Sequence, residues 1–363
     1  GNAADVVLIQ DTAVAGTERS LFVLNNAEHI RFQNLTLRRT MMNGSATGGT
    51  FPTAHIDANQ ASFLQVSGCV FQDSVVSTFV SRDNYGINAE NSSNVTISGN
   101  SFLGFATAVA LGSTSGSALT LNQVTNNSFA GYLDAITAFD QLGMLISGNT
   151  FNQQRPNGMA AVTLNQVSAC QVHSNRFSGV VYNAQIRVTN SDDSIGQPTR
   201  LYNNSIAVDF NPSGVFGLNA PILIEGFSDT SSAFPDPKDG IELAFNTIKV
   251  RCLGNSTSTS LNYGLIHAVD NTFGPVAPTS PFVNLSIYNN NLYAESVAGS
   301  AVPSSWSALL LETDSIARKC SSNYNNFYLK PIPGQTQGGN LTSVQLLNLS
   351  FGTCSAWTTA YNK

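Results

Sequence analysis

The sequence predicts an all-β fold in which a single chain winds into a solenoid of stacked parallel strands. Three observations predict it. A six-residue phrase returns along the chain, pairs of alternating apolar residues precede most copies, and no stretch keeps a helical period for long. Alternating apolar residues are typical of strands, and self-similarity of this kind is expected when one supersecondary unit is stacked many times.

The repeated phrase consists of an apolar residue, two variable residues, Asn, one more residue and a second apolar residue. In the segment "V-T-I-S-G-N-S-F", Val95 to Phe102, it runs from Ile97 through Asn100 to Phe102. Successive copies of the Asn are separated by 22 to 44 residues. The seven Asn residues are Asn100, Asn127, Asn149, Asn175, Asn204, Asn246 and Asn290.

The Asn position of the phrase predicts an internal ladder. Asn side chains at the same inward corner of successive turns lie about 4.8 Å apart, so their amides can hydrogen-bond to one another and to backbone groups of the corner. Asn also tolerates the left-handed backbone that a tight corner needs. Leu35 and Cys69 occupy this position in the first turns, so we expect the ladder to start at Asn100.

The predicted elements follow one another in a fixed order. Residues 1–20 contain a lead-in strand, residues 20–330 contain the repeat turns, and residues 331–363 form a closing segment. Short strands at these separations leave no room for helical crossovers, so each strand is expected to pair in parallel with its copy in the next turn. The repeat lengths predict about ten turns. Because the register is unbroken, we expect the whole chain to form one domain.

The later repeats carry long insertions. They lie at residues 211–240, 254–263, 269–281 and 297–305 and are rich in Gly, Pro, Ser and Asn. Insertions in a solenoid tend to project from one face and to carry binding residues. The aromatic residues in or beside them include Phe216, Phe227, Phe234, Tyr263 and Trp306. We predict that these rings contact glycans; the alternative is that they only anchor their own loops.

The composition excludes several classes of partner. Charged residues make up 10% of the chain, the net charge is -6 and the isoelectric point is near 5.1. Such a chain has no basic footprint, so we expect no nucleic-acid partner. No window of about 18 apolar residues exists, so we expect no membrane insertion. Cys and His residues show no zinc-site spacing, and we predict no metal and no cofactor.

The repeat resembles that of the right-handed parallel β-helix proteins, and the segment Val95 to Phe102 carries the resemblance over about residues 20–330. The segments Gly1 to Ala13 and Phe22 to Leu37 near the start, and "S-N-Y-N-N-F-Y-L" at Ser322 to Leu329, are similar to β-helical regions of very large secreted surface proteins of Bacteroidota. This resemblance implies a single-stranded right-handed parallel β-helix. It also implies export by the type IX route to the bacterial cell surface.

The same resemblance implies that the chain is a fragment of a larger polypeptide, whose neighbouring domains are its partners. Gly1 is not a start methionine, and an open β-helix end needs a cover. We therefore expect either that a neighbouring segment of a longer polypeptide caps the first turn or that the chain was trimmed there. The implied role is that of an extended structural or adhesive element that contacts glycans through its long loops.

The alternative function is a polysaccharide lyase or a glycoside hydrolase with a cleft on the β-helix. A hydrolase needs two nearby carboxylates, and a lyase needs a base beside a neutralising cation. The best acidic group comprises Asp192 and Asp193 with Asp209 on the next turn, near Arg187. The Asp pair is also typical of a solvated loop whose side chains hydrogen-bond their own turn. We therefore assign no catalytic residue and prefer the non-catalytic role.

Two covalent modifications are predicted as open alternatives. Cys320 and Cys354 flank the last turn and would clasp the C-terminal end if they form a disulfide. Asp followed by Ser or Thr and then an apolar residue resembles the O-glycosylation signal of Bacteroidota, although such triplets also arise by chance. The candidate acceptors are Thr12, Ser74, Ser194 and Ser315.

Overall fold

The fold was analysed in a computed structural model of the chain. The described residues are 7–11, 20–40, 53–73, 84–114, 116–153, 160–181, 184–189, 197–210, 220–225, 240–252, 262–269, 284–296, 305–311, 320–330, 340–346 and 349–351. Within these ranges the regular elements are strands, joined by bends and turns, and no helix occurs. The predicted all-β class is therefore confirmed.

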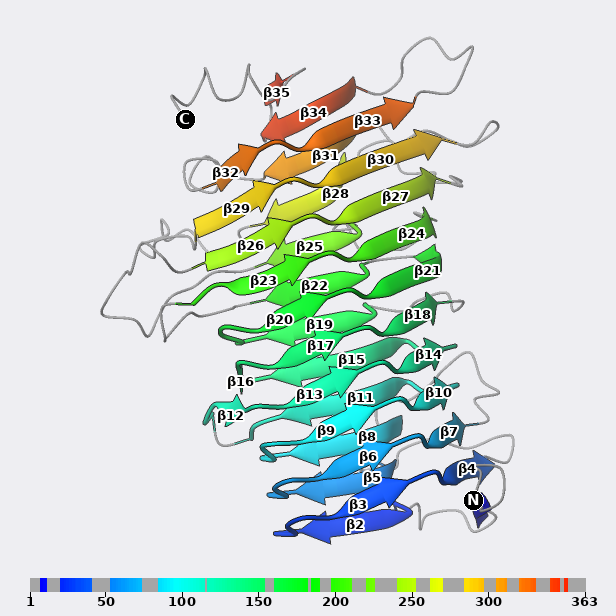
Figure 1. The fold of residues 1–363 in the computed structure, drawn as a ribbon. Helices are drawn as coiled ribbons and strands as arrows, with labels where there is room; N and C mark the ends of the chain where they lie inside the picture. The colour runs from blue at the N-terminus through cyan, green and yellow to red at the C-terminus, as the bar shows by residue number, and fades with distance from the viewer. Residues whose placement is uncertain are drawn as a thin grey trace, which may run out of the picture.

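The strands form three long sheets that run the length of the coil (Figure 1). Sheet I contains β2 (Phe22–Asn25), β5 (Thr53–Asn59), β8 (Asn84–Glu90), β11 (Thr107–Gly112), β15 (Asp134–Phe139), β19 (Val162–Asn165), β22 (Ile186–Thr189), β25 (Ile222–Glu225), β28 (Asn262–Val269), β31 (Ser305–Leu311), β34 (Asn340–Leu346) and β35 (Leu349–Phe351). Sheet II contains β3 (Arg31–Gln33), β6 (Gln65–Ser67), β9 (Thr96–Ser98), β13 (Gln123–Thr125), β17 (Leu145–Ser147), β20 (Gln171–His173), β23 (Thr199–Tyr202), β26 (Gly240–Ala244), β29 (Asn284–Tyr288) and β32 (Cys320–Asn323).

Sheet III completes each turn. It contains β1 (Val7–Asp11), β4 (Thr36–Thr40), β7 (Val70–Asp73), β10 (Ser101–Leu103), β14 (Ser128–Ala130), β18 (Thr150–Gln153), β21 (Arg176–Val181), β24 (Ser205–Phe210), β27 (Thr247–Cys252), β30 (Asn291–Ser296) and β33 (Asn326–Lys330). A short fourth ladder joins β12 (Leu119–Thr120) to β16 (Gln141–Leu142).

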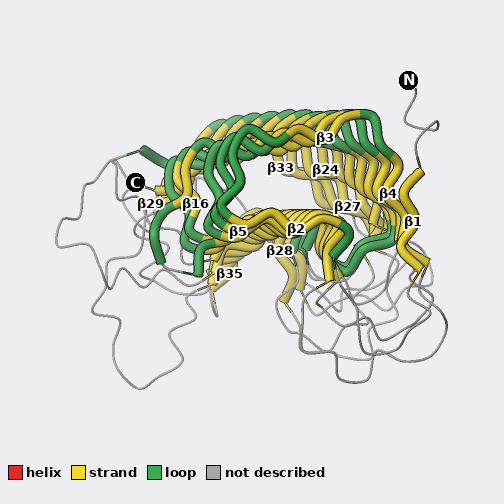
Figure 2. The backbone as a smooth tube through the Cα atoms, turned by 90° about the horizontal axis from the view of Figure 1, so that it is seen from below, coloured by secondary structure: helices red, strands yellow, loops and turns green. Residues whose placement is uncertain are grey.

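Each complete turn contributes one strand to sheet I, one to sheet II and one to sheet III. Ten such turns run from β2-β3-β4 to β31-β32-β33, each strand pairing in parallel with its copies. Seen along the axis, successive turns superimpose (Figure 2). The predicted solenoid of about ten turns is confirmed. Stacking also continues past residue 330, because β34 pairs in parallel with β31 before β35 folds back antiparallel to it.

One predicted loop contains a strand. Residues 211–240 were expected to form a single insertion, but β25 lies inside this span and pairs in parallel with β22 and β28. The physical reason is that every turn must supply a strand to sheet I, and the short apolar run from Ile222 to Ile224 is fully buried there. The prediction of one uninterrupted loop is therefore wrong at this strand.

The interior of the coil is a single apolar cluster built from alternate residues of all three sheets. Aromatic rings form its most regular part. Neighbouring rings are stacked with centroids 4.6 to 5.0 Å apart. This column consists of Phe71, Phe102, Phe129, Phe151 and Phe177. In-register pairing aligns the rings, because each Phe occupies the same position of its sheet III strand.

The internal Asn ladder is present from Asn100 onward. Asn127 shows the repeating pattern: its Nδ2 donates to Oδ1 of Asn149 (3.1 Å) and to the carbonyl of Ile97 (2.9 Å). Its Oδ1 accepts from the Nδ2 of Asn100 (3.0 Å). The same links continue through the predicted residues to Asn290. All of these amides are buried, so the ladder satisfies the polar groups of the corner between sheets II and III.

Two details of the ladder differ from the prediction. It includes Asn325, whose Oδ1 accepts from Nδ2 of Asn290 (2.9 Å). The left-handed backbone is found at the residue before each ladder position, and not at the ladder Asn itself. Ten corner residues have this conformation: Asn34, Gly68, Gly99, Asn126, Gly148, Ser174, Asn203, Phe245, Asn289 and Tyr324.

Candidate functional site

A group of charged and aromatic side chains lies on the outer face of sheet III in the last turns. On β27 the buried Ile248 and Val250 alternate with Lys249 and Arg251, which therefore point outward. The equivalent outward positions on β24, β30 and β33 complete the group through the parallel register. We name it the sheet III patch. It comprises Asp209, Lys249, Arg251, Tyr293, Glu295 and Tyr328.

A bidentate ion pair forms one side of the patch. Arg251 donates from Nε to Oδ1 of Asp209 (2.7 Å) and from a terminal nitrogen to Oδ2 (2.5 Å). The hydrogen bonds to Asp209 raise the pKa of Arg251 above its usual range. Half of the Arg251 side chain is exposed, so this pair is screened by water and serves mainly to fix the orientation of the guanidinium.

An aromatic pair forms the centre of the patch. The rings of Tyr293 and Tyr328 are stacked at 4.9 Å with an interplanar angle of 7°. Lys249 places its Nζ 5.4 Å from the centroid of the Tyr293 ring. Tyr293 also donates its hydroxyl to Oε2 of Glu295 (2.6 Å). The outer ring, Tyr328, is 52% exposed and lies on the last strand of sheet III that the structure describes.

The hydrogen bond to Glu295 raises the pKa of Tyr293 to about 12, because loss of the phenol proton would remove this hydrogen bond and place two negative charges side by side. The substitution Glu295→Gln should therefore lower the pKa of Tyr293 toward its ordinary value. Tyrosinate absorbance during an alkaline titration measures this shift, and Tyr293→Phe identifies which transition belongs to Tyr293. Glu242→Gln, at an ion pair with Arg200 on sheet II, is the control. An unchanged titration in Glu295→Gln would contradict the effect of the Glu295 carboxylate on Tyr293.

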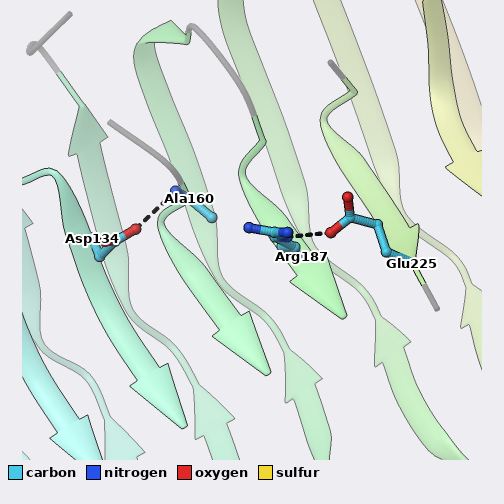
Figure 3. A network of polar contacts seen from close by, with 4 residues as sticks. All are labelled: Asp134, Ala160, Arg187 and Glu225. Carbon is cyan, nitrogen blue, oxygen red and sulfur yellow. Dashed lines mark hydrogen bonds and ion pairs between the residues drawn. The ribbon is translucent and has the colours of Figure 1, made fainter. Parts of the chain in front are cut away.

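A second polar group lies on the outer face of sheet I (Figure 3). Arg187 on β22 forms an ion pair with Glu225 on β25, and Asp134 accepts a hydrogen bond from the backbone nitrogen of Ala160 (3.0 Å). The Glu225 side chain is only 3% exposed. Buried residues of the same turns form a small apolar cluster separate from the main core, made of Ala160, Ala184, Ala220, Leu223 and Val269. A buried pair of this kind fixes packing and offers no free carboxylate for chemistry.

The structure separates Arg187 from Asp209, a member of the predicted acidic group. Arg187 lies on sheet I with Glu225 as its partner, whereas Asp209 lies on sheet III with Arg251 as its partner. The expectation that Arg187 lies near Asp209 is therefore wrong, because the two strands belong to different walls of the coil. Asp192 and Asp193 lie outside the described residues.

Most other predicted site residues also fall outside the described part of the chain. These are Phe216, Phe227, Phe234, Thr12, Ser74, Ser194, Ser315 and Cys354. Tyr263 and Trp306 are placed by their backbones alone, as register partners on β28 and β31. Cys320 is buried at the start of β32. The predicted disulfide, glycosylation sites and loop contacts thus stay predictions.

The sequence analysis missed Tyr293, Glu295 and Tyr328. A usable signal was present, because each lies at a fixed offset from a ladder Asn. Lys249 is the third residue after Asn246, Tyr293 is the third after Asn290, and Tyr328 is the third after Asn325. Arg251 is the fifth residue after Asn246, and Glu295 is the fifth after Asn290. Alignment on the predicted ladder residues therefore brings Tyr293 and Glu295 beside Lys249 and Arg251 before any coordinates are known, whereas Tyr328 requires the unpredicted Asn325.

The part of the chain that the structure describes contains no group of three or more His, Cys, Asp or Glu residues arranged to hold a metal ion. None of the described residues forms a helix long and apolar enough to cross a membrane.

A match to a known protein family agrees with the architecture. Residues 8–206 match the family described as "Right handed beta helix region". A mutant tailspike protein of E. coli bacteriophage HK620, in complex with a pentasaccharide, is 10% identical with a TM-score of 0.40, over 94% of this chain and 72% of that chain. The catalytic domain of a GH87 α-1,3-glucanase mutant, in complex with tetrasaccharides, is 11% identical with a TM-score of 0.35, over 93% of this chain and 64% of that chain. No curated protein sequence matches significantly.

Proposed function

Because the chain belongs to the right-handed β-helix family, whose pattern it matches over residues 8–206, we propose that it is an extended scaffold that binds glycans on the sheet III patch. In this proposal the stacked turns form a stiff rod, and the patch gives the rod an adhesive surface near its C-terminal turns. The location that goes with this role is the outside of a bacterial cell, as the resemblance to exported surface proteins implies.

The observation that supports glycan binding best is the exposed Tyr293–Tyr328 stack with hydrogen-bonding groups around it. A sugar ring has an apolar C–H face and a rim of hydroxyls. The face suits an aromatic ring, and the rim suits carboxylates and guanidinium groups. The sheet, the cation of Lys249 and the hydrogen bond to Glu295 hold the inner ring in place. Little side-chain entropy is then lost when a ligand binds.

Cleavage of the glycan is supported less well. Asp209 and Glu295 occupy the same outward column two strands apart, which places their Cα atoms about 10 Å from each other. In inverting glycosidases the two carboxyl groups themselves are about 6.5–9.5 Å apart. However, Arg251 engages both oxygens of Asp209, and Glu295 accepts the hydroxyl of Tyr293. Neither carboxylate is poised to deliver a proton to a leaving group.

Removal of the Tyr328 ring tests the proposal. We expect Tyr328→Ala to weaken binding by about 10-fold to 100-fold, because exposed aromatic anchors dominate interfaces of this kind. Affinity electrophoresis in gels that contain hydroxyethylcellulose, xylan or galactomannan measures the effect. Leu103→Ala is the matched control, since Leu103 is 46% exposed and occupies the same column of sheet III in an early turn.

Equal weakening by Tyr328→Ala and Leu103→Ala, or binding that Tyr328→Ala leaves unchanged, would refute a site at the patch. The same polysaccharides are also incubated with the protein, and reducing ends are measured. Release of reducing ends that disappears in Glu295→Gln would replace the binding role with a hydrolytic one.

A further inference from the structure

At the corner between sheets II and III, two residues carry large aromatic side chains in a backbone conformation that disfavours them; at the other corner Phe63 does the same. The residue before each ladder position has a positive φ in all ten complete turns, and in seven of these turns it is Asn or Gly. In the eighth and tenth turns it is Phe245, with φ 56°, and Tyr324, with φ 55°. Bulky side chains are rare in this region, because their Cβ atoms crowd the backbone.

Neither ring serves the core. Phe245 is 55% exposed and Tyr324 is 88% exposed. Asn or Gly would make the same corner with less strain, as other turns of this chain show. Strained residues that persist without a packing role are often held for function. Both rings are therefore free of the core and open to solvent.

The corner residues form a straight track along the axis of the coil. The backbone nitrogen of Asn203 donates to Ala244 (3.1 Å), that of Phe245 donates to Tyr288 (3.3 Å), and that of Asn289 donates to Asn323 (3.2 Å). Successive corners are thus one strand spacing apart, and Phe245 and Tyr324 lie about 10 Å apart with Asn289 between them.

The track alternates amides with rings. Its order is Asn203, Phe245, Asn289, Tyr324, and all four side chains are exposed. The ring of Tyr288 meets Phe245 edge to face at 5.9 Å and 84°, which steadies the Phe245 ring. No charged residue belongs to the track. The nearby charges of Arg200 and Glu242 on sheet II neutralise each other in an ion pair.

We propose that Asn203, Phe245, Asn289 and Tyr324 form a second sugar-binding track at the corner between sheets II and III, which takes an uncharged linear polysaccharide lying along the axis. Rings two strands apart receive alternate sugar units, and the amide of Asn289 hydrogen-bonds the hydroxyls between them. This inference rests on the proposed function and deepens it, because it specifies an extended neutral chain as the ligand. The absence of charge from the track favours such a chain over an anionic one.

The test uses a substitution that suits the corner conformation. In the double variant Phe245→Asn with Tyr324→Asn, both residues tolerate positive φ, so the fold is kept while both rings are removed. We expect binding to hydroxyethylcellulose to weaken by about 10-fold or more, the loss typical of removed anchor residues. Thermal unfolding that is unchanged or shifted upward shows that the variant is folded.

Leu121→Asn is the matched control. Leu121 also has a positive φ, of 59°, and is 60% exposed, but it lies at another corner in the fourth turn. Its replacement relieves the same backbone strain and removes an exposed apolar side chain away from the track. Binding by this variant should equal that of the unmodified protein.

The outcomes separate the two sites. Weaker binding in the corner variant supports the track, whether or not Tyr328→Ala also weakens it. Unchanged binding in the corner variant, together with loss in Tyr328→Ala, overturns the track and leaves the sheet III patch. Absence of binding by the unmodified protein to every neutral polysaccharide overturns both. If the unmodified protein instead self-associates in sedimentation velocity and the corner variant does not, the rings contact a second copy of the chain, and the sugar track is refuted.

Discussion

Replacing Asn149 with Ala should destabilise the coil by about 3–5 kcal/mol, because each buried backbone group that loses its partner costs about 1–3 kcal/mol. The Asn149 side chain accepts from the backbone nitrogen of Asn127 (2.9 Å) and from its Nδ2 (3.1 Å). It donates to the carbonyl of Val124 (2.8 Å) and to Oδ1 of Asn175 (3.0 Å). All of these groups are buried, and Ala offers none of the four hydrogen bonds.

Urea unfolding followed by circular dichroism measures this loss, with Asn323→Ala as the control because Asn323 is an exposed Asn outside the ladder. Solenoids do not always unfold in one step. Amide hydrogen exchange in the turns that contain Asn127 and Asn175 is therefore measured as well. If Asn149→Ala costs no more than Asn323→Ala, the ladder does not contribute to stability.

The fold could be predicted because the core is specified by local spacing. A buried amide at each corner and an apolar residue two positions later recur in every turn from Asn100 to Leu292. The last rung was missed because Ser322 replaces the apolar residue that opens the phrase before Asn325. β25 was missed because its apolar run is short and lies within a long polar stretch. In both cases the pairing with neighbouring turns fixes the conformation, although the local sequence does not show the repeat pattern.

The candidate site was harder to predict because outward positions carry no packing constraint. Asp209, Arg251 and Glu295 are 42 and 44 residues apart along the chain, and only the register of the parallel strands makes them neighbours. The sequence analysis placed Asp209 in a functional group but assigned it Arg187 as a neighbour, on the wrong sheet. Phe245 and Tyr324 could be recognised only from their backbone angles, because the spacing of residues in the sequence does not show which of them are strained.

Replacing Phe129 with Ala should cost about 3–5 kcal/mol from the cavity, with about 0.5–1.5 kcal/mol more from lost ring stacking. Phe129 is 1% exposed and lies between Phe102 and Phe151, at 5.0 Å from each. Phe129→Leu keeps most of the volume and should cost less than about 1.5 kcal/mol. Phe139→Ala is the control, because Phe139 is 40% exposed on the outer face of sheet I.

The number of turns that Phe129→Ala destabilises shows whether a core defect in an early turn affects the binding surface in the last turns. Each turn contacts only its neighbours, so protection from hydrogen exchange should fall in the turns of Phe102, Phe129 and Phe151 and much less in the turns of Tyr293 and Tyr328. Glycan binding by Phe129→Ala at low temperature should then equal that of the unmodified protein. Equal loss of protection in every turn would show that the coil unfolds as one unit, and mutations in its early turns would then weaken binding at the sheet III patch.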